Sequence, residues 1–532
     1  MRLNKSTLKN LLGDLPWVPE AYWRMRSFGR PVTAKFDLHR LKQALPDWCA
    51  QANAARPSLA GHPASVLLFG TLRYWLEHVT ALGLAFAGQG HRVTLAYLPY
   101  AEWAKPFNRF DARRQNAYAS QILGMAEPLL DVVSLLNSPQ AAMPAALADA
   151  IAENALRDTQ YTLQVENVSL DSDLYQLRLE RDTAAAGAVF SLMESGQPEI
   201  VVIPNGTILE FGAVYQTAKF LGVPVVTYEF GEQKQRLWLA QNAEVMRQST
   251  DDLWAVRQNQ TLTEAQLEQA RTLFAARQRA TLWENFARRW QGTPSEGGET
   301  VRAALELDSR PVVLLATNVI GDSLTLGRQV FSDSMSEWLE RTVHWFAQHP
   351  ESQLVVRIHP GELITKGPSV ADVVKKAIPS LPAGLPSHIH LIPADAKVNT
   401  YDIVEIADLG LVYTTTVGME MAMSGVPVIA VGNTHYRGKG FTLDANTWEA
   451  FFETLQQVLN DPTAYRLKLE TVERAWNYAY RFFFEYPHPF PWHILHFWDD
   501  LKEWPLARVL SAEGQEAFGK TFRYLVGEPV QW

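Results

Sequence analysis

Residues 412–442 (VYTTTVGMEMAMSGVPVIAVGNTHYRGKGFT) combine residue types that suit a phosphate and a sugar. An apolar strand leads into a turn with three consecutive threonines, and a helix of two to three turns follows. Amides at a helix N-terminus and threonine hydroxyls can donate to a phosphate, a glycine lets a ligand approach, and a glutamate can accept from a ribose diol. Alternatively, the threonines cap the helix and the glutamate is solvated. The candidates are Thr414, Thr415, Thr416, Gly418 and Glu420.

Three further loops place polar side chains directly after a predicted strand. In RIHPGE the proline ends the strand, so the histidine stands at the carboxyl edge, where it can bind a phosphate or act as acid or base. GNTHYRGKGFT spaces basic residues with glycines, which suits a diphosphate, and TNVIGDS offers a carboxylate for a sugar hydroxyl or acid–base chemistry. The alternatives are a histidine that caps the next helix and a loop with incidental charge. The candidates are Asn318, Asp322, Arg357, His359, Glu362, His435, Arg437 and Lys439.

The motifs RIHPGE, YTTTVGMEMAMSGVPVI and THYRGKGFT resemble the bacterial capsule polysaccharide biosynthesis protein family, over about residues 200–445. That family is similar in turn to the two-domain nucleotide-sugar glycosyltransferases of GT-B type, including Kdo and sialyl transferases with a His-Pro motif. The resemblance implies a donor site in the C-terminal domain, with His359 and Thr415 or Thr416 at the phosphate and Glu420 at the ribose. Threonines stand in place of serines of the best-known enzymes, and the donor and the catalytic base stay open.

The N-terminal half is expected to bind the acceptor and supply the base. In GTLRYWLEHVTALG a glutamate and a histidine follow the first strand closely, and a base must reach the acceptor hydroxyl. The histidine is the first choice and the glutamate the second, while a histidine satisfied at a packing interface is the alternative. The loops PNGT and TYEFGEQ follow two further strands, and their acids are open alternatives for the base. The catalytic candidates are His78, Glu77 and Asp322, and the acceptor candidates are Asn205, Glu210 and Glu229.

These side chains need strands that end at a common edge. Short apolar runs predict buried strands in the N-terminal half: SVLLFG, HRVTLAYL, EIVVIP and VPVVTYEFG. A helical stretch is predicted over roughly 115–196. Similar apolar runs predict buried strands in the C-terminal half: RPVVLLATNV, QLVVRIHPGE, HIHLIPA, DIVEIADLGLVYTTT and GVPVIAVG. SEWLERTVHWFAQHP predicts a helix with Trp338, Leu339, Thr342 and Phe346 on one face.

Strands that alternate with helices predict an α/β protein with two Rossmann-like doubly wound domains facing a cleft, as in GT-B folds, with helical N- and C-terminal extensions. The predicted organisation is a helical extension and linker (1–62), an acceptor domain (63–258), a helical connection (259–308), a donor domain (309–462) and aromatic-rich C-terminal helices (463–532). The aromatic cluster in 463–532 predicts helix packing, with a peripheral membrane surface or an acceptor wall as the sharper alternative.

Composition narrows the function classes. The chain has 532 residues, 47% of them hydrophobic, so it is long enough for two cores and is not a disordered chain. A net charge of −9 argues against a nucleic-acid partner. The single cysteine, Cys49, indicates a reducing compartment, and neither a signal peptide nor an apolar run of membrane-spanning length is apparent.

The sequence therefore predicts a cytoplasmic bacterial glycosyltransferase that moves a sugar from a nucleotide-sugar donor to a surface polysaccharide or glycolipid acceptor. We expect no cofactor and no metal, since no DxD-like motif stands out. Location at the inner face of the membrane is an open possibility. The alternatives are a nucleotide-sugar 2-epimerase-like enzyme and a non-catalytic nucleotide- or sugar-binding component of a capsule assembly complex; a phosphoglycerol-type transferase is a weaker fourth.

Overall fold

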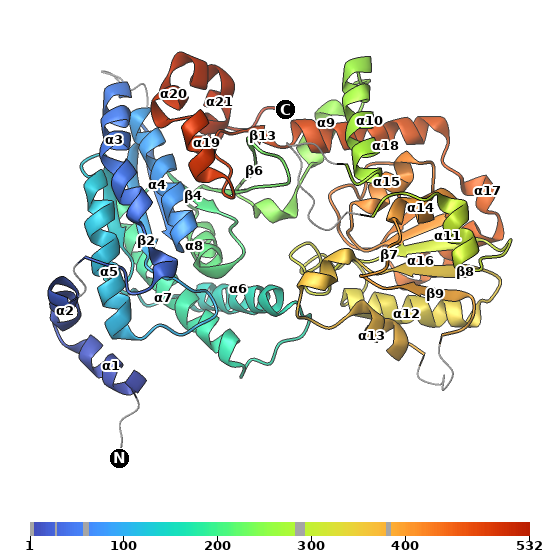
Figure 1. The fold of residues 1–532 in the computed structure, drawn as a ribbon, viewed down its shortest axis with the longest axis horizontal. Helices are drawn as coiled ribbons and strands as arrows, with labels where there is room; N and C mark the ends of the chain where they lie inside the picture. Colours follow the sequence, from blue (N-terminus) through green and yellow to red (C-terminus); the bar gives the residue numbers. More distant parts are fainter. Residues whose placement is uncertain (1–4, 27–28, 57–62, 282–292, 379–384) are drawn as a thin grey trace. The chain divides into compact units, whose positions relative to one another are not determined.

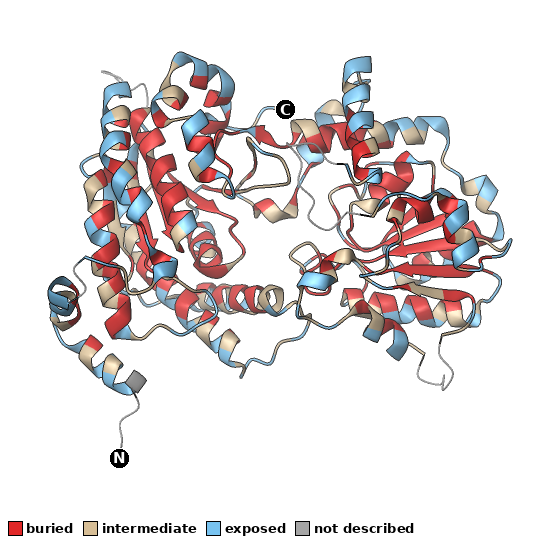
Figure 2. Cartoon of the chain, in the orientation of Figure 1, coloured by how far each residue is buried: buried red, intermediate tan, exposed pale blue. Residues whose placement is uncertain are grey.

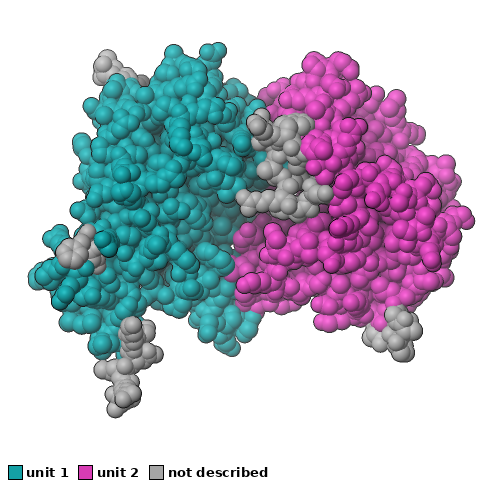
Figure 3. Space-filling view, in the orientation of Figure 1, with its two compact units in different colours: residues 1–159, 169–246, 487–531 teal, residues 160–168, 247–486, 532 magenta. Residues whose placement is uncertain are grey.

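The computed structural model describes residues 5–26, 29–56, 63–281, 293–378 and 385–532. The chain forms two compact units, coloured separately in Figure 3. Unit 1 contains residues 1–159, 169–246 and 487–531, and unit 2 contains residues 160–168, 247–486 and 532. The chain thus passes between the units several times. Residues 57–62 of the predicted linker and 282–292 of the predicted connection lie outside the described residues.

Unit 1 is built on a seven-stranded sheet in the order β13-β6-β5-β4-β1-β2-β3. Strands β1 to β5 are parallel; at one edge β6 pairs antiparallel with β5, and β13 pairs antiparallel with β6. Right-handed crossovers place α4 and α5 on one face and α7 and α8 on the other (Figure 1). The strands are β1 (Ser65–Thr71), β2 (Arg92–Leu98), β3 (Leu130–Ser134), β4 (Ile200–Pro204), β5 (Val225–Glu229), β6 (Arg236–Gln241) and β13 (His488–Pro489).

Helices between the strands cover this sheet, and further helices come from both ends of the chain. The helices between the strands are α4 (Arg73–Gly88), α5 (Arg109–Leu123), α6 (Ala145–Leu163), α7 (Asp173–Gly196) and α8 (Leu209–Phe220). The N-terminal helices are α1 (Lys5–Asp14), α2 (Val18–Arg26) and α3 (His39–Ala55), and the C-terminal ones are α19 (Phe497–Glu503), α20 (Leu506–Leu510) and α21 (Ala512–Leu525). Helix α3 packs on α4, and α20 packs on both.

Unit 2 is built on a six-stranded, all-parallel sheet in the order β12-β11-β10-β7-β8-β9. The strands are β7 (Val312–Ala316), β8 (Gln353–Arg357), β9 (Ile389–Ile392), β10 (Leu409–Val412), β11 (Val428–Ala430) and β12 (Leu443–Asp444). The helices are α9 (Asp251–Arg257), α10 (Glu264–Gln278), α11 (Gly298–Ala304), α12 (Met335–Gln348), α13 (Val370–Lys376), α14 (Thr400–Ile406), α15 (Val417–Met423), α16 (Trp448–Asn460), α17 (Pro462–Tyr465) and α18 (Leu469–Tyr480).

Both sheets are covered on two faces, so their inner strands are continuous apolar runs (Figure 2). Every residue of β4, β7 and β8 is buried. These observations confirm the predicted fold class, α/β with two Rossmann-like doubly wound domains and helical extensions. The predicted face of α12 is confirmed as well, because Trp338, Leu339, Thr342 and Phe346 are each fully buried.

A short segment of unit 2, residues 160–168, comes from the end of α6. It lies against two glycines: a Cβ on Gly321 would stand 2.3 Å from the Val165 nitrogen, and one on Gly367 would stand 2.1 Å from the Gln164 carbonyl. Glu166 accepts hydrogen bonds from the amides of Met335 (2.8 Å) and Ser336 (3.3 Å), at the start of α12. The segment therefore caps a helix of unit 2.

The aromatic-rich end of the chain is interior packing. Tyr478, Phe490 and Trp492 are at most 1% exposed, and their rings contact neighbouring aromatic side chains. Residues up to 486 belong to unit 2, whereas 487–531 belong to unit 1. The packing interpretation of this segment therefore fits the structure better than a membrane surface. Among the described residues, no helix combines the length and hydropathy needed to cross a bilayer.

Candidate functional site

The strand order of unit 2 creates a topological switch point. From the central β7 the chain moves to β8 and β9 on one side, and then to β10, β11 and β12 on the other. In such sheets a ligand binds outside the carboxyl ends of the strands, where the order reverses. Here this place lies between β7 and β10, and the loops after β7, β8, β10 and β11 end at the same edge.

Hydrogen bonds tie these loops together. The Thr414 amide donates to Asn318 Oδ1 (3.2 Å), and the His359 amide donates to Thr317 Oγ1 (3.1 Å). The Thr434 hydroxyl donates to the Thr414 carbonyl (3.3 Å). The structure thus brings three predicted site residues, Asn318, His359 and Thr414, to one edge. We name the switch-point cluster for its members: Thr317, Asn318, His359, Thr414, Thr415 and Thr434.

His359 has a defined orientation and charge state. Its Nδ1 accepts a hydrogen bond from the Gly361 amide (2.9 Å), so the neutral ring carries its proton on Nε2. Burial, followed by the nearby Arg357, lowers the pKa of His359 to about 4. The imidazole is therefore neutral at physiological pH and presents an N–H donor on Nε2. The alternative in which His359 caps the next turn is realised through Nδ1.

Two buried polar atoms near this edge lack a partner. Thr414 Oγ1 and His435 Nε2 are shielded from solvent and make no hydrogen bond to any described residue. His435 itself is fixed, because its ring stacks on Phe482 at 3.8 Å and its Nδ1 contacts the Tyr478 hydroxyl (2.9 Å). Leaving a buried polar atom without a partner costs about 1–3 kcal/mol, which points to a ligand group or water in this region.

Two predicted donor-site residues shape loops instead. The Arg357 guanidinium donates to the carbonyls of Pro393 (2.6 Å) and Val398 (3.3 Å). The Glu362 carboxylate accepts from the Ser369 hydroxyl and the Val370 amide at the start of α13. Both side chains therefore have partners within unit 2.

The basic loop is also internally bonded. Arg437 donates to the carbonyls of Ala430 and Ala445, and Lys439 forms an ion pair with Asp251. Lys439 is 5% exposed, so its ammonium group is not displayed on a flexible surface loop. The expectation that Arg437 and Lys439 reach a diphosphate does not fit these contacts, because each cation already has partners.

Glu420 lies in a buried ion pair rather than in an open site. Its carboxylate is 2.5 Å from the Arg277 guanidinium, and the two side chains are 3% and 0% exposed. Tyr401 lies beside the pair, and burial, followed by the Glu420 charge, raises its pKa. A ribose contact would require Glu420 to leave a cation that is fully enclosed. The geometry supports a role in joining α10 to α15.

The start of α15 is closed by its own neighbours. A Cβ on Gly418 would stand 2.4 Å from the Tyr436 hydroxyl, which donates to the Thr415 carbonyl (2.6 Å). The Gly418 and Met419 amides donate to the carbonyls of Thr415 and Thr416. Gly418 therefore makes room for Tyr436 and not for a ligand.

The loop after β7 contributes one predicted and one unpredicted group. Asp322 accepts from the Ser323 hydroxyl (3.1 Å), and burial raises the pKa of its carboxyl. Arg328, which the sequence motifs did not single out, is 6% exposed and donates to the carbonyls of Arg247 and Asn433. Thr317 and Thr434 were missed too, although a polar residue directly after an apolar strand was the signal that identified Asn318.

Unit 1 has its own switch point, between β1 and β4. Asn205 follows β4 in the left-handed region (φ 56°), and its Nδ2 donates to Glu229 Oε2 at the end of β5 (2.8 Å). Its Oδ1 accepts from the amide and hydroxyl of Thr207. Burial raises the pKa of Glu229. The predicted acceptor residues Asn205 and Glu229 therefore form one hydrogen-bonded pair at the carboxyl edge of the sheet.

The two predicted bases on α4 point into the core. His78 is fully buried, its ring nitrogens contact the Tyr228 hydroxyl (3.2 Å) and the Trp492 carbonyl (3.3 Å), and burial lowers its pKa to about 3. Glu77 is 3% exposed and accepts from Trp498 Nε1 (3.0 Å). Neither side chain can reach an acceptor hydroxyl from this position, so the interface alternative describes His78 better.

Glu210 is likewise enclosed. It is 2% exposed in a buried group of charged side chains with Asp158, Asp182 and Arg178, between α6, α7 and α8. Asn154 donates to Asp182 (2.9 Å), and Arg178 is 3.0 Å from Asp158. Glu210 is therefore buried within this charged group.

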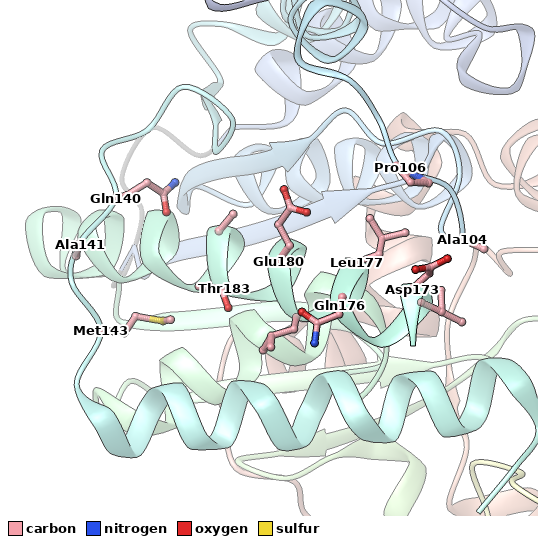
Figure 4. Close-up of a pocket in the computed structure, with 13 residues that line it drawn as sticks. Ala104, Pro106, Gln140, Ala141, Met143, Asp173, Gln176, Leu177, Glu180 and Thr183 are labelled. Carbon is pink, nitrogen blue, oxygen red and sulfur yellow. The ribbon is translucent and has the colours of Figure 1, made fainter. Parts of the chain in front are cut away.

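Three cavities of the described residues lie away from the switch-point cluster. The largest, about 1160 Å³, is a groove along α7 whose wall includes Leu177, Glu180 and Met143 (Figure 4). One of about 590 Å³ lies beside α10 and α14, and one of about 540 Å³ lies beside α4 and α21. In the described ranges, no group of three or more His, Cys, Asp and Glu side chains is arranged to hold a metal ion.

No protein-family model and no curated protein matches this chain. Solved structures with similarity include a beta Kdo 2,7 transferase, KpsC of Thermosulfurimonas dismutans (16% identity, 55% of this chain and 79% of that one, TM-score 0.31). Another is a UDP-GlcNAc 2-epimerase of Neisseria meningitidis, with 14% identity over 79% of this chain and 98% of that one and a TM-score of 0.26. A third is sucrose-phosphate synthase of Thermosynechococcus elongatus, with 14% identity over 78% of this chain and 94% of that one and a TM-score of 0.27. Scores this low assign neither a family nor an activity.

Proposed function

We propose that this protein is a metal-independent glycosyltransferase that moves a sugar from a nucleotide-sugar donor to a surface polysaccharide or glycoconjugate acceptor, on the cytoplasmic side of a bacterial membrane. The observation that carries the proposal is the switch-point cluster. It combines a neutral, oriented His359 with a buried Thr414 hydroxyl that has no partner among the described residues. Hydrogen-bond donors at the switch point of a parallel sheet suit the phosphate of a nucleotide.

In the proposed reaction the acceptor hydroxyl attacks the anomeric carbon of the donor. A new C–O bond forms while the bond from that carbon to the diphosphate or monophosphate oxygen breaks, and negative charge develops on the leaving phosphate. His359 Nε2–H and the Thr414 hydroxyl donate to that phosphate and stabilise the charge. A general base takes the proton from the acceptor hydroxyl as the new bond forms.

The first test is thermal unfolding of the full chain with UDP-, GDP-, CMP- and dTDP-sugars. A ligand at about 100 times its Kd should stabilise the folded protein by about 2.7 kcal/mol. We expect one nucleotide class to raise the Tm. His359→Ala and Thr414→Val should each lose most of this shift, because each removes a phosphate donor. His344→Ala, on the exposed part of α12, is the matched control and should keep it.

Two results would contradict the proposal. One is a Tm that no nucleotide-sugar changes, and the other is unchanged binding in both His359→Ala and Thr414→Val. Incubation of a bound donor without acceptor then separates the activities. Release of a C2 epimer would instead support the epimerase alternative, and binding without turnover in the presence of glycan acceptors would support a non-catalytic component.

A further inference from the structure

Helices α1 and α2 attach to unit 1 through polar side chains. Lys9 pairs with Asp111 of α5 (2.5 Å), and Arg113 of α5 pairs with Glu20 of α2 (2.7 Å). On α1 a Cβ added to Gly13 would stand 2.5 Å from the Phe110 nitrogen, so this side of the helix lies directly against the α5 backbone. The face that α1 turns to the protein is therefore its polar and glycine-containing face.

The opposite face of α1 is apolar and exposed. Leu8 and Leu11 are three residues apart on one side of α1, and Leu15 directly follows the helix; the three side chains are 47%, 52% and 47% exposed. An amphipathic helix normally buries such a stripe against its own core. Here the orientation is reversed, which leaves the stripe without a partner in the described part of the chain.

The exposed apolar surface continues through the turn into α2. Trp17 is 80% exposed, Met25 is 68% exposed and Tyr22 is 43% exposed. Figure 1 shows α1 and α2 beside α5, and Figure 2 colours many residues of both helices as exposed. We call the surface formed by these side chains the N-terminal apolar face: Leu8, Leu11, Leu15, Trp17, Tyr22 and Met25.

Positive charge accompanies this face. The first 30 residues contain six lysines and arginines and two acids, although the whole chain has a net charge of −9. Both acids pair with arginines of α5, Asp14 with Arg109 and Glu20 with Arg113. Arg24 and Arg26 are exposed on α2, in the same turn as Met25. The surface is thus apolar with basic side chains at its border.

We propose that the N-terminal apolar face docks on an anionic lipid bilayer. Its apolar side chains would enter the boundary between headgroups and acyl chains, where tryptophan is favoured, and the arginines would contact lipid phosphates. A second copy of this chain fits less well. A twofold contact through this face would bring the same basic segments together, so like charges would oppose it.

The experiment is co-sedimentation of the full chain with vesicles. Phosphatidylcholine vesicles with about 30% phosphatidylglycerol should bind the protein at least about tenfold more tightly than phosphatidylcholine alone, since each arginine near an anionic surface favours binding. The double variant Trp17→Ser/Met25→Ser should bind the anionic vesicles about tenfold or more weakly. Arg24→Gln/Arg26→Gln should lose most of the preference for anionic lipid.

Leu469→Ser is the matched control, because Leu469 is 73% exposed on a different helix, and it should bind as the unchanged protein does. All substituted side chains are exposed, so the Tm of each variant should stay unchanged. The proposal is overturned if the unchanged protein stays in the supernatant with anionic vesicles, or if Trp17→Ser/Met25→Ser sediments equally well. It is also overturned if light scattering shows a dimer that this double variant dissociates while vesicles bind nothing, which would assign the face to a second copy.

Discussion

At the residue scale, Gly361 controls the orientation of His359. A Cβ at position 361 would stand 2.7 Å from His359 Nδ1 and 3.3 Å from a methyl of Val319, so Gly361→Ala must move the imidazole. We expect nucleotide-sugar binding to weaken by about tenfold, or about 1.4 kcal/mol, because the Nε2–H donor no longer points at the phosphate. Titration calorimetry with the stabilising nucleotide measures the change.

Gly196→Ala is the control for this substitution, because a Cβ at position 196 meets no atom within 4 Å. It should bind the nucleotide as the unchanged protein does. Equal affinity in Gly361→Ala would show that the orientation of His359 does not matter for binding.

Glu420 and Arg277 carry a second prediction at this scale. Removing one partner of a buried ion pair is strongly destabilising, by about 3–5 kcal/mol. We therefore expect Glu420→Ala to lower the Tm clearly, whereas Glu420→Leu with Arg277→Met should recover part of the loss. Thermal unfolding measures both. An unchanged Tm together with lost nucleotide binding would instead support the ribose contact that the resemblance implies.

The sequence predicted the positions of some site residues well, but it did not predict the internal partners of others. The positions of His359 and Thr414 follow from local chemistry, since a proline and a threonine run each come directly after an apolar strand. The partners of Glu420 and Lys439 lie 143 and 188 residues away in the chain. No local pattern pairs residues so far apart, so a charged side chain with an internal partner looks the same in sequence as one that awaits a ligand.

At the scale of elements, the packing of α6, α7 and α8 encloses several carboxyls. Burial, followed by the charges of Glu210 and Asp158, raises the pKa of Asp182 well above its usual range, and burial raises the pKa of Asp158 to about 6. A carboxyl with a raised pKa in the folded state binds its proton more tightly folded than unfolded. Below about pH 4 the carboxyl is protonated in both states and does not change the free energy of unfolding. Above that pH it destabilises the fold increasingly.

Asp182→Asn tests this consequence. The amide oxygen can still accept from Asn154, while the buried acid is gone. We expect a higher Tm than the unchanged protein at pH 8, with the difference shrinking as the pH falls toward about 4. Thermal unfolding of the two proteins across this range gives the answer. A difference that does not vary with pH would mean that Asp182 is not protonated preferentially in the folded state.

Strands in the interior of a sheet were predicted more reliably than strands at its edge. EIVVIP and RPVVLLATNV became β4 and β7, every residue of which is buried. Strand β3 falls inside the stretch predicted as helical, because as an edge strand it has one fully buried residue and a sequence, LDVVS, with little apolar signal. The two-residue strands β12 and β13 depend on neighbouring strands rather than on their own sequence.

At the scale of the whole molecule, unit 2 depends on residues contributed from a distant part of the chain. Glu166→Ala removes the acceptor at the start of α12 and should cost about 1 kcal/mol. In differential scanning calorimetry we expect a downshift, of about 2–4 °C for a unit of this size, in the transition that the bound nucleotide raises. Glu153→Ala is the control, because Glu153 is 72% exposed in unit 1. Equal downshifts in both variants would refute a specific role for residues 160–168.

The return of residues 487–531 to unit 1 has a consequence for biosynthesis. A ribosome that adds about 5–20 residues per second takes on the order of 10–50 s to translate residues 247–486. During that interval the nascent unit 1 lacks Trp492 and Phe522, both of which belong to its core. The part of the protein that is begun first is therefore completed last, and its unfinished apolar surface is a natural client for chaperones.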